Sequence, residues 1–264
     1  MRLVHSGGRV VRRRALACLL GGVLLLAAGC ASDQEEVESQ VDYHYRLGMA
    51  HLQDNNPQGA LVEFREALKE DNNSAKVNFA MGHSYFLLDD EQNAEKSMKK
   101  VLKVEPDNGE AINYLGNIYE KEGRLDDAVV QFKKAAVSTT YMTPHFAYRN
   151  LGRVYREKKD DALAEEALKT AVKRVPEYFP ARADLAKLYM DQSRWDEAIQ
   201  EWKKLLDLAP EVADAHFYLG QSYLGKGDAV DAKQEIAAFV LQAEKGHPLL
   251  PQAKGLLQKL GDQN

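Results

Sequence analysis

The sequence predicts an all-α solenoid, in which successive helix pairs stack on one another. One observation is a series of alanines separated by steps of 34, 34, 36, 34 and 34 residues: Ala60, Ala94, Ala128, Ala164, Ala198 and Ala232. A second series of small residues lies twelve positions earlier: Gly48, Gly82, Gly116, Gly152, Ala186 and Gly220. A period of 34 residues is typical of stacked helix pairs. Only Gly or Ala lets helix backbones approach closely, so we expect these residues where the two helices of a pair cross.

Composition agrees with this prediction and narrows the choice of partners. A repeat array of 264 residues needs only one continuous core. Residues 1–29 contain five arginines and no acidic residue. Of the 35 basic residues of the chain, 30 therefore lie in residues 30–264 with all 40 acidic ones, which gives that part a net charge of −10. Nucleic-acid binding selects a basic surface. We therefore expect no nucleic-acid partner.

Residues 1–29 are predicted to be a signal peptide. The apolar stretch 15–29 follows an arginine cluster and, as a helix, would span roughly 22 Å, short of the ~30 Å hydrocarbon core of a bilayer. Leu-Ala-Ala-Gly-Cys at residues 26–30 resembles the bacterial lipobox, which implies cleavage before Cys30 and lipid modification of that cysteine. The alternative is an ordinary signal peptide with an incidental cysteine. Cleavage would also remove Cys18, leaving no free thiol and no disulfide.

The residues after the expected anchor indicate where it holds the chain. In the bacterial lipoprotein pattern, Asp directly after the cysteine favours the inner membrane, whereas Ala31 and Ser32 follow here. The resemblance implies the inner leaflet of the outer membrane, facing the periplasm, with two or three acyl chains for stable attachment. Residues 30–40 are polar and acidic, and we expect a flexible tether there.

Six repeats fill most of the remaining chain, at 41–74, 75–108, 109–142, 145–178, 179–212 and 213–246. Large apolar residues follow the alanines by four positions and make a stripe on the second helix of each pair: Phe64, Met98, Phe132, Leu168, Trp202 and Ile236. The pattern resembles the tetratricopeptide repeat family, which implies a right-handed superhelix. Residues 247–264 are expected to cap it, with a helix at about 249–260.

Catalytic patterns are absent from the sequence. The seven histidines form neither an HExxH motif nor a Cys/His cluster. His44 and His51 could share a helix face, but His51 stands where other repeats have tyrosine, which explains it without a metal. We therefore expect a non-enzyme with no metal, no small-molecule substrate and no cofactor beyond the covalent lipid on Cys30.

In the tetratricopeptide family, positions two, five, nine and twelve of each repeat face inward. In the first two repeats these positions and one neighbour are apolar or aromatic: Tyr45, Met49, Leu52, Phe79, His83, Phe86 and Leu87. They favour a groove for a hydrophobic segment of a partner. The alternative is packing against the tether or the first turn.

The fourth repeat differs because its inward positions are basic. Arg149, Arg153 and Arg156 form one ridge, and Asn113 and Asn117 are expected to face it from the third repeat. Such a ridge suits carboxylates held in bidentate pairs and loosely resembles a carboxylate clamp. The alternative is a solvated face paired with Glu120, Glu122 or Glu157.

The single step of 36 comes from two extra residues within 137–144, followed by Asn-Leu-Gly at 150–152. With the lipobox, the six repeats and the length, this segment resembles the type IV pilus pilotins, the PilF/PilW and Tgl lipoproteins. The resemblance implies binding to the secretin PilQ and help with its outer-membrane localisation and multimerisation, hence pilus biogenesis and twitching motility. The alternative is a scaffold lipoprotein that organises cell-wall or other envelope enzymes.

Overall fold

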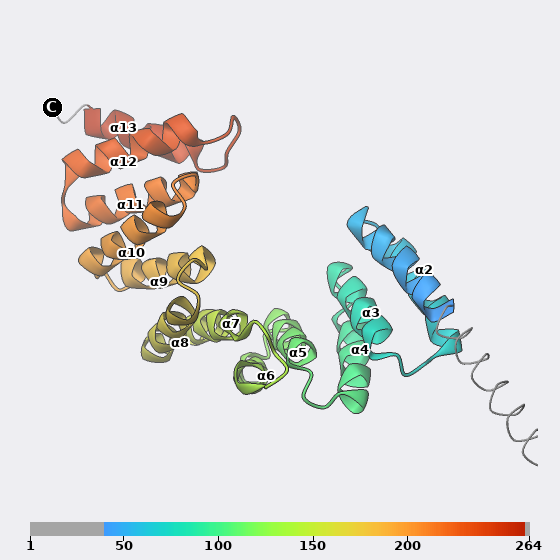
Figure 1. The fold of residues 1–264 in the computed structure, drawn as a ribbon. Coiled ribbons are helices and arrows are strands. Elements are labelled where there is room, and N and C mark those ends of the chain that lie inside the picture. The colour runs from blue at the N-terminus through green and yellow to red at the C-terminus, as the bar shows by residue number, and fades with distance from the viewer. Residues whose placement is uncertain (1–39, 262–264) are drawn as a thin grey trace, which may run out of the picture. The chain divides into compact units, whose positions relative to one another are not determined.

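The computed structural model describes residues 40–261, and all regular secondary structure in that range is helical (Figure 1). A first helix covers residues 40–53. It is followed by α2 (Pro57–Glu70), α3 (Ala75–Leu87), α4 (Glu91–Val104), α5 (Gly109–Lys121), α6 (Leu125–Val137), α7 (Pro144–Glu157), α8 (Asp161–Arg174), α9 (Phe179–Asp191), α10 (Trp195–Leu208), α11 (Ala213–Lys226), α12 (Ala229–Gln242) and α13 (Leu250–Gly261). The expected signal peptide and Cys30, with the tether up to residue 39, lie outside the described residues. Within that range no helix combines the length and apolar character that a membrane crossing requires.

The helices form two compact units that divide between Val104 and Glu105. The N-terminal unit holds the first two helix pairs, and the C-terminal unit holds four pairs and α13. In a stack of helix pairs each pair contacts only its neighbours, so the core can divide between two pairs without exposing a common centre.

Small residues lie where the helices of a pair cross, as the sequence predicts. The six alanines of the first series are fully buried. A Cβ atom added to Gly48 would lie 2.3 Å from Cε1 of Phe64, and one added to Gly116 would lie 2.4 Å from Cε1 of Phe132. The glycine therefore leaves room for the large side chain that follows the alanine of the same repeat by four positions.

A third periodic feature lies in the turns between paired helices. One residue in each turn has a positive φ, between 54° and 90°, at Asn55, Asp89, Gly123, Lys159, Ser193 and Gly227. These positions repeat at the same intervals as the alanines. Only two of them are glycine, so four residues adopt a backbone conformation that costs L-amino acids about 1 kcal/mol or more.

The segment with the two extra residues, 137–144, forms hydrogen bonds to the residues at the start of α5. The hydroxyl groups of Ser138 and Thr140 both donate to the backbone carbonyl of Asp107, the first at 2.9 Å, and Thr139 donates to the Asp107 carboxylate at 3.1 Å. The amide of Gly109, at the first turn of α5, donates to Thr140 Oγ1 at 3.2 Å. The extra residues thus supply acceptors and donors that a shorter turn would lack.

The C-terminal helix covers the last pair as expected, although it begins one residue later than predicted and ends at Gly261. Its Ala253 and Leu260 are buried against Phe217, Ile236 and Phe239. The exposed end of the last repeat is therefore capped.

Candidate partner-binding surfaces

The first surface is the apolar patch of the N-terminal unit, formed by the seven residues predicted to line a groove. Tyr45, Met49 and Leu52 on the first helix are half-buried and pack against the core, where the Tyr45 and Phe64 ring centroids are 6.1 Å apart. Packing against the core therefore accounts for much of their surface, whereas the alternative placed the contact at the tether or the first turn.

The second half of the apolar patch comes from α3, which lies beside the first helix. Lys76 joins the two helices because its ammonium pairs with Asp42 and stands 5.5 Å from the centroid of the Tyr45 ring. Phe79, His83 and Phe86 recur along α3 at helical spacing and are partly exposed, while Leu87 is 49% exposed. Burial lowers the pKa of His83, so its ring is neutral at neutral pH. The patch therefore presents apolar side chains and a neutral imidazole on α3, with the paired Lys76 ammonium at its edge.

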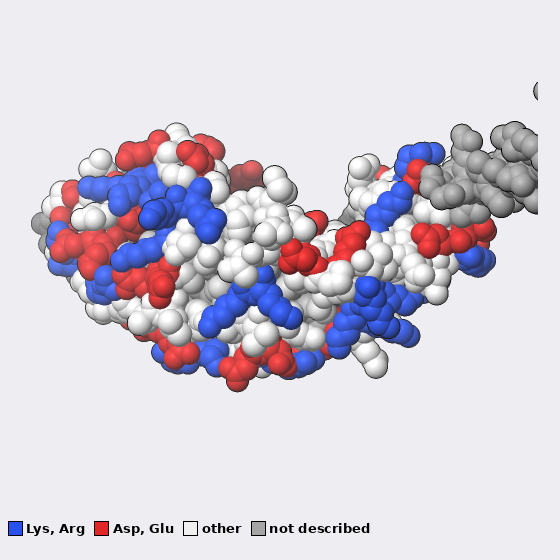
Figure 2. Space-filling view, turned by 60° about the horizontal axis from the view of Figure 1, so that its bottom comes forward, with Lys and Arg blue, Asp and Glu red and all other residues white. Residues whose placement is uncertain are grey.

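The second surface is a polar ladder in the C-terminal unit, where α5, α7 and α9 lie side by side. Each arginine of the predicted ridge pairs with a carboxylate of an adjacent first helix: Arg149 with Asp184 at 2.6 Å, Arg153 with Glu120 at 2.6 Å, and Arg156 with Asp191 at 2.5 Å. This matches the alternative of a paired face, although Glu120 is the only predicted partner that takes part. Figure 2 shows basic and acidic side chains interspersed on one face of the molecule.

An asparagine that was not among the predicted site residues links α5 to α7 within the ladder. The side-chain amide of Asn150 donates to Asn113 at 3.2 Å and to Asn117 at 3.1 Å, and its oxygen accepts from Arg153 at 3.4 Å. Asn113 and Asn117 thus face α7 as predicted, but through Asn150. The sequence does contain a sign of its role. Asn150 lies two residues before Gly152, where the two helices of the repeat were predicted to cross, so a buried position could have been expected for it.

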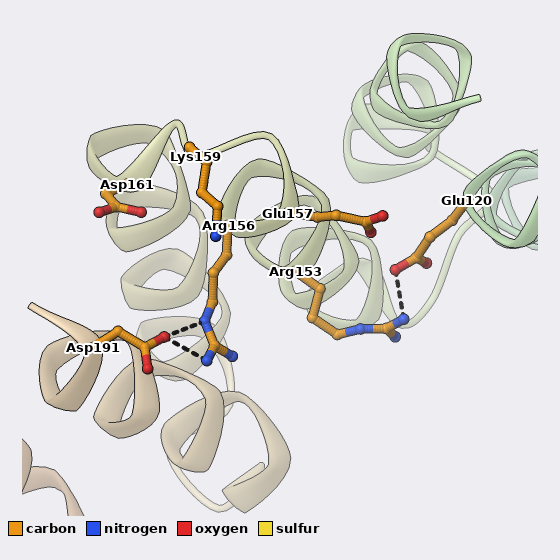
Figure 3. A pocket seen from close by; sticks show the side chains of 7 residues that line it. All are labelled: Glu120, Arg153, Arg156, Glu157, Lys159, Asp161 and Asp191. Carbon is orange, nitrogen blue, oxygen red and sulfur yellow. Dashed lines mark hydrogen bonds and ion pairs between the residues drawn. The ribbon is translucent and has the colours of Figure 1, made fainter. Parts of the chain in front are cut away.

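Arg153 and Arg156 also line an open pocket of about 720 Å³ near the end of α7 (Figure 3). Burial raises the pKa of Glu120 even though the Arg153 guanidinium acts to lower it. Among the described residues, no ion pair joins the other charged side chains of this pocket: Glu157, Lys159 and Asp161. The pocket offers both signs of charge and so suits a polar segment better than an apolar one.

The two histidines of the first helix lie beside polar side chains. His44 Nδ1 lies 2.8 Å from the Glu63 carboxylate, and His51 lies beside the turn residue Asn56. Within residues 40–261 no group of three or more His, Cys, Asp or Glu side chains is placed to hold a metal ion.

Comparison with known proteins agrees with the helix-pair architecture. Tetratricopeptide repeat models match residues 41–74, 75–108, 97–130 and 155–206, and a TPR repeat model matches residues 186–227. The chain is a tetratricopeptide repeat protein. Folds of this class serve as protein-interaction scaffolds.

The chain further resembles PilF and PilW in sequence and structure. The type IV pilus assembly protein PilF of Pseudomonas aeruginosa is 27% identical over 125 residues, which cover 47% of this chain and 50% of PilF. The match thus spans half the length of that relative. A solved structure of Pseudomonas aeruginosa PilF superposes with a TM-score of 0.70 at 20% identity, over 87% of this chain and all of that one. PilW, described as a widely conserved type IV pilus biogenesis factor, superposes with a TM-score of 0.70 at 24% identity, over 83% of this chain and 97% of PilW.

Proposed function

We propose that the chain is an outer-membrane lipoprotein that acts as a pilotin for a type IV pilus secretin. The observation that carries the proposal is the apolar patch on α3, in which Leu87 is half-exposed and its neighbour Phe86 is partly exposed. The similarity to PilF and PilW supports a role in pilus biogenesis. The predicted lipid on Cys30 supports attachment to the outer membrane.

The mechanism needs only binding and location. The acyl chains hold the chain at the inner leaflet of the outer membrane, and the apolar patch covers an apolar segment of an unassembled PilQ subunit. Confinement to the membrane raises the local concentration of subunits where rings form. Neighbouring subunits then replace the patch as the ring closes, so no energy source is required.

A charge placed on the patch tests the proposal. Leu87→Glu should leave the unit folded, because a half-exposed side chain contributes little to the core, but it should abolish heat-resistant secretin multimers in a strain that lacks the wild-type gene. Val62→Glu on α2 is the matched control, because Val62 is 53% exposed in the same unit and lies outside the patch. Circular dichroism of both purified variants checks folding.

Normal multimers in the deletion strain would refute the proposal outright. Normal multimers with Leu87→Glu alone would refute the assignment of the patch. If envelope enzymes rather than the secretin crosslink to the patch, the scaffold function replaces the pilotin function. Cys30→Ser should remove the protein from the outer-membrane fraction and prevent labelling with a palmitate analogue.

A further inference from the structure

A second exposed apolar surface lies in the C-terminal unit, at the opposite end of α7 from the charged pocket. His145 and Phe146 in the first turn of α7 contact Tyr178, which directly precedes α9. The ring centroids of Phe146 and Tyr178 are 5.0 Å apart in an edge-to-face arrangement, and those of His145 and Tyr178 are 4.9 Å apart. Met142 and Phe179 flank these rings along the chain. We call these five residues the aromatic patch.

The aromatic patch is held in place although it is exposed. Met142 is 89% exposed and Phe146 is 39% exposed. Beside them, Tyr141 is buried against Gly109, where an added Cβ would lie 2.3 Å from the Tyr141 Cβ. Arg149 donates to the Tyr178 hydroxyl at 3.5 Å while it pairs with Asp184. The patch is therefore a preformed surface, so a ligand would bind it with little ordering cost.

Two exposed carboxylates stand near the aromatic patch. Glu110 is exposed and close enough to Tyr141 to add to the rise of the Tyr141 pKa that burial causes, and exposed Glu177 directly precedes Tyr178. Neither carboxylate has an ion pair within the described residues. Of the cations near these residues, Arg149 is paired with Asp184, and the Arg174 guanidinium lies over the Tyr148 ring, 5.0 Å from its centroid. Burial lowers the pKa of His145, so its ring is neutral at neutral pH.

We propose that the aromatic patch docks a basic, apolar segment of a partner protein, in which an aromatic or large aliphatic side chain is flanked by Lys or Arg. The apolar side chain would cover Phe146 and Tyr178, and the flanking cations would meet Glu110 and Glu177. Cations also bind favourably near aromatic faces. An acidic segment would meet like charges. This surface is separate from the apolar patch assigned to the secretin and does not depend on that assignment.

Two labelled peptides test the proposal with the full chain in detergent. Acetyl-Gly-Lys-Phe-Leu-Lys-Gly-amide should bind about fivefold tighter than the same peptide with Glu in place of both Lys residues, as judged by fluorescence anisotropy. Phe146→Ala should weaken binding of the basic peptide about tenfold. Glu177→Lys should remove the preference for it. Val230→Ala is the control, because Val230 is 78% exposed on α12 and far along the chain from the patch.

Three results would overturn the proposal. These are equal affinity for the two peptides, no binding of the basic peptide, and unchanged affinity of a Phe146→Ala variant with intact helix content. Concentration-dependent self-association that Phe146→Ala abolishes, measured by sedimentation, would instead assign the patch to a second copy of the chain. Failure of the pilotin proposal would leave all of these results unchanged, because none involves the secretin.

Discussion

Replacing two glycines by alanine should change the stability of the C-terminal unit in opposite directions. Gly116 faces the fully buried Phe132, and an added Cβ would lie 2.4 Å from its ring. Gly255 lies in α13, and a Cβ there would meet nothing within 4 Å. The same substitution therefore creates a steric clash at Gly116 and none at Gly255.

The magnitudes follow from two competing effects. Alanine gains about 1 kcal/mol over glycine in a helix interior, whereas overfilling a packed core costs typically about 1–3 kcal/mol. A contact of 2.4 Å forces Phe132 or the helix to move, so we expect a cost in the upper part of this range, about 2–3 kcal/mol. Less the gain of about 1 kcal/mol, Gly116→Ala should lower the free energy of unfolding by about 1–2 kcal/mol. Gly255→Ala should raise it by about 0.5–1 kcal/mol.

Urea unfolding followed by tryptophan fluorescence measures both changes. The two tryptophans of the chain, Trp195 and Trp202, lie in the C-terminal unit with both glycines, so a single transition compares the variants. Equal m-values would show that the midpoints report stability. The reasoning fails if Gly116→Ala is as stable as the wild type, or if both substitutions shift the midpoint in the same direction.

Three further predictions concern pH, a turn and the cap. The hydrogen bond from Arg194 lowers the pKa of Glu165 to about 2, so this carboxylate stabilises the fold above its usual pKa of 4.5, and that stability is lost as the pH falls towards 2. Since Arg194 is partly exposed, the contribution is about 1–2 kcal/mol, and Glu165→Gln should flatten the decline of the thermal midpoint between pH 5 and 3. Lys159→Gly should stabilise the unit by about 0.5–1 kcal/mol in urea, because Lys159 has a φ of 65°; a loss would show that its side chain matters more than its backbone. Deletion of residues 250–264 should expose apolar side chains of α12 and cause aggregation on a sizing column, and a monodisperse truncated protein would contradict the role of α13 as a cap.

The helix pairs could be predicted from sequence because close helix crossings require small residues, which therefore recur at a fixed period. Ala94 and Gly82 must be small wherever two helices cross, so the same residue types recur at the same places. The positive φ values of Asp89 and Lys159 recur with equal regularity but leave no such trace. Their strain is small enough for many residue types, so the sequence shows glycine at only two of the six turns.

Contacts between repeats were harder to predict than contacts within them. Arg149 and Asp184 are 35 residues apart, whereas Arg153 and Glu120 are separated by 33. Which carboxylate an arginine reaches depends on the offset and rotation of neighbouring helix pairs, and the sequence period gives neither. The apolar patch was predicted as a set, but the burial of Tyr45 and Met49 against the core depends on the same stacking geometry.

The bonds from residues 138–140 to Asp107 and Gly109 bear on how the array can change by recombination. In an array of independent modules, any one repeat can be deleted, duplicated or exchanged at its loops. Here the segment at the end of the third repeat also bonds to the residues at the start of that repeat. A chimera that joins a foreign repeat between residues 137 and 144 would leave the start of α5 without these hydroxyl groups. The third repeat and the connection up to residue 144 therefore have to be transplanted together with Asp107.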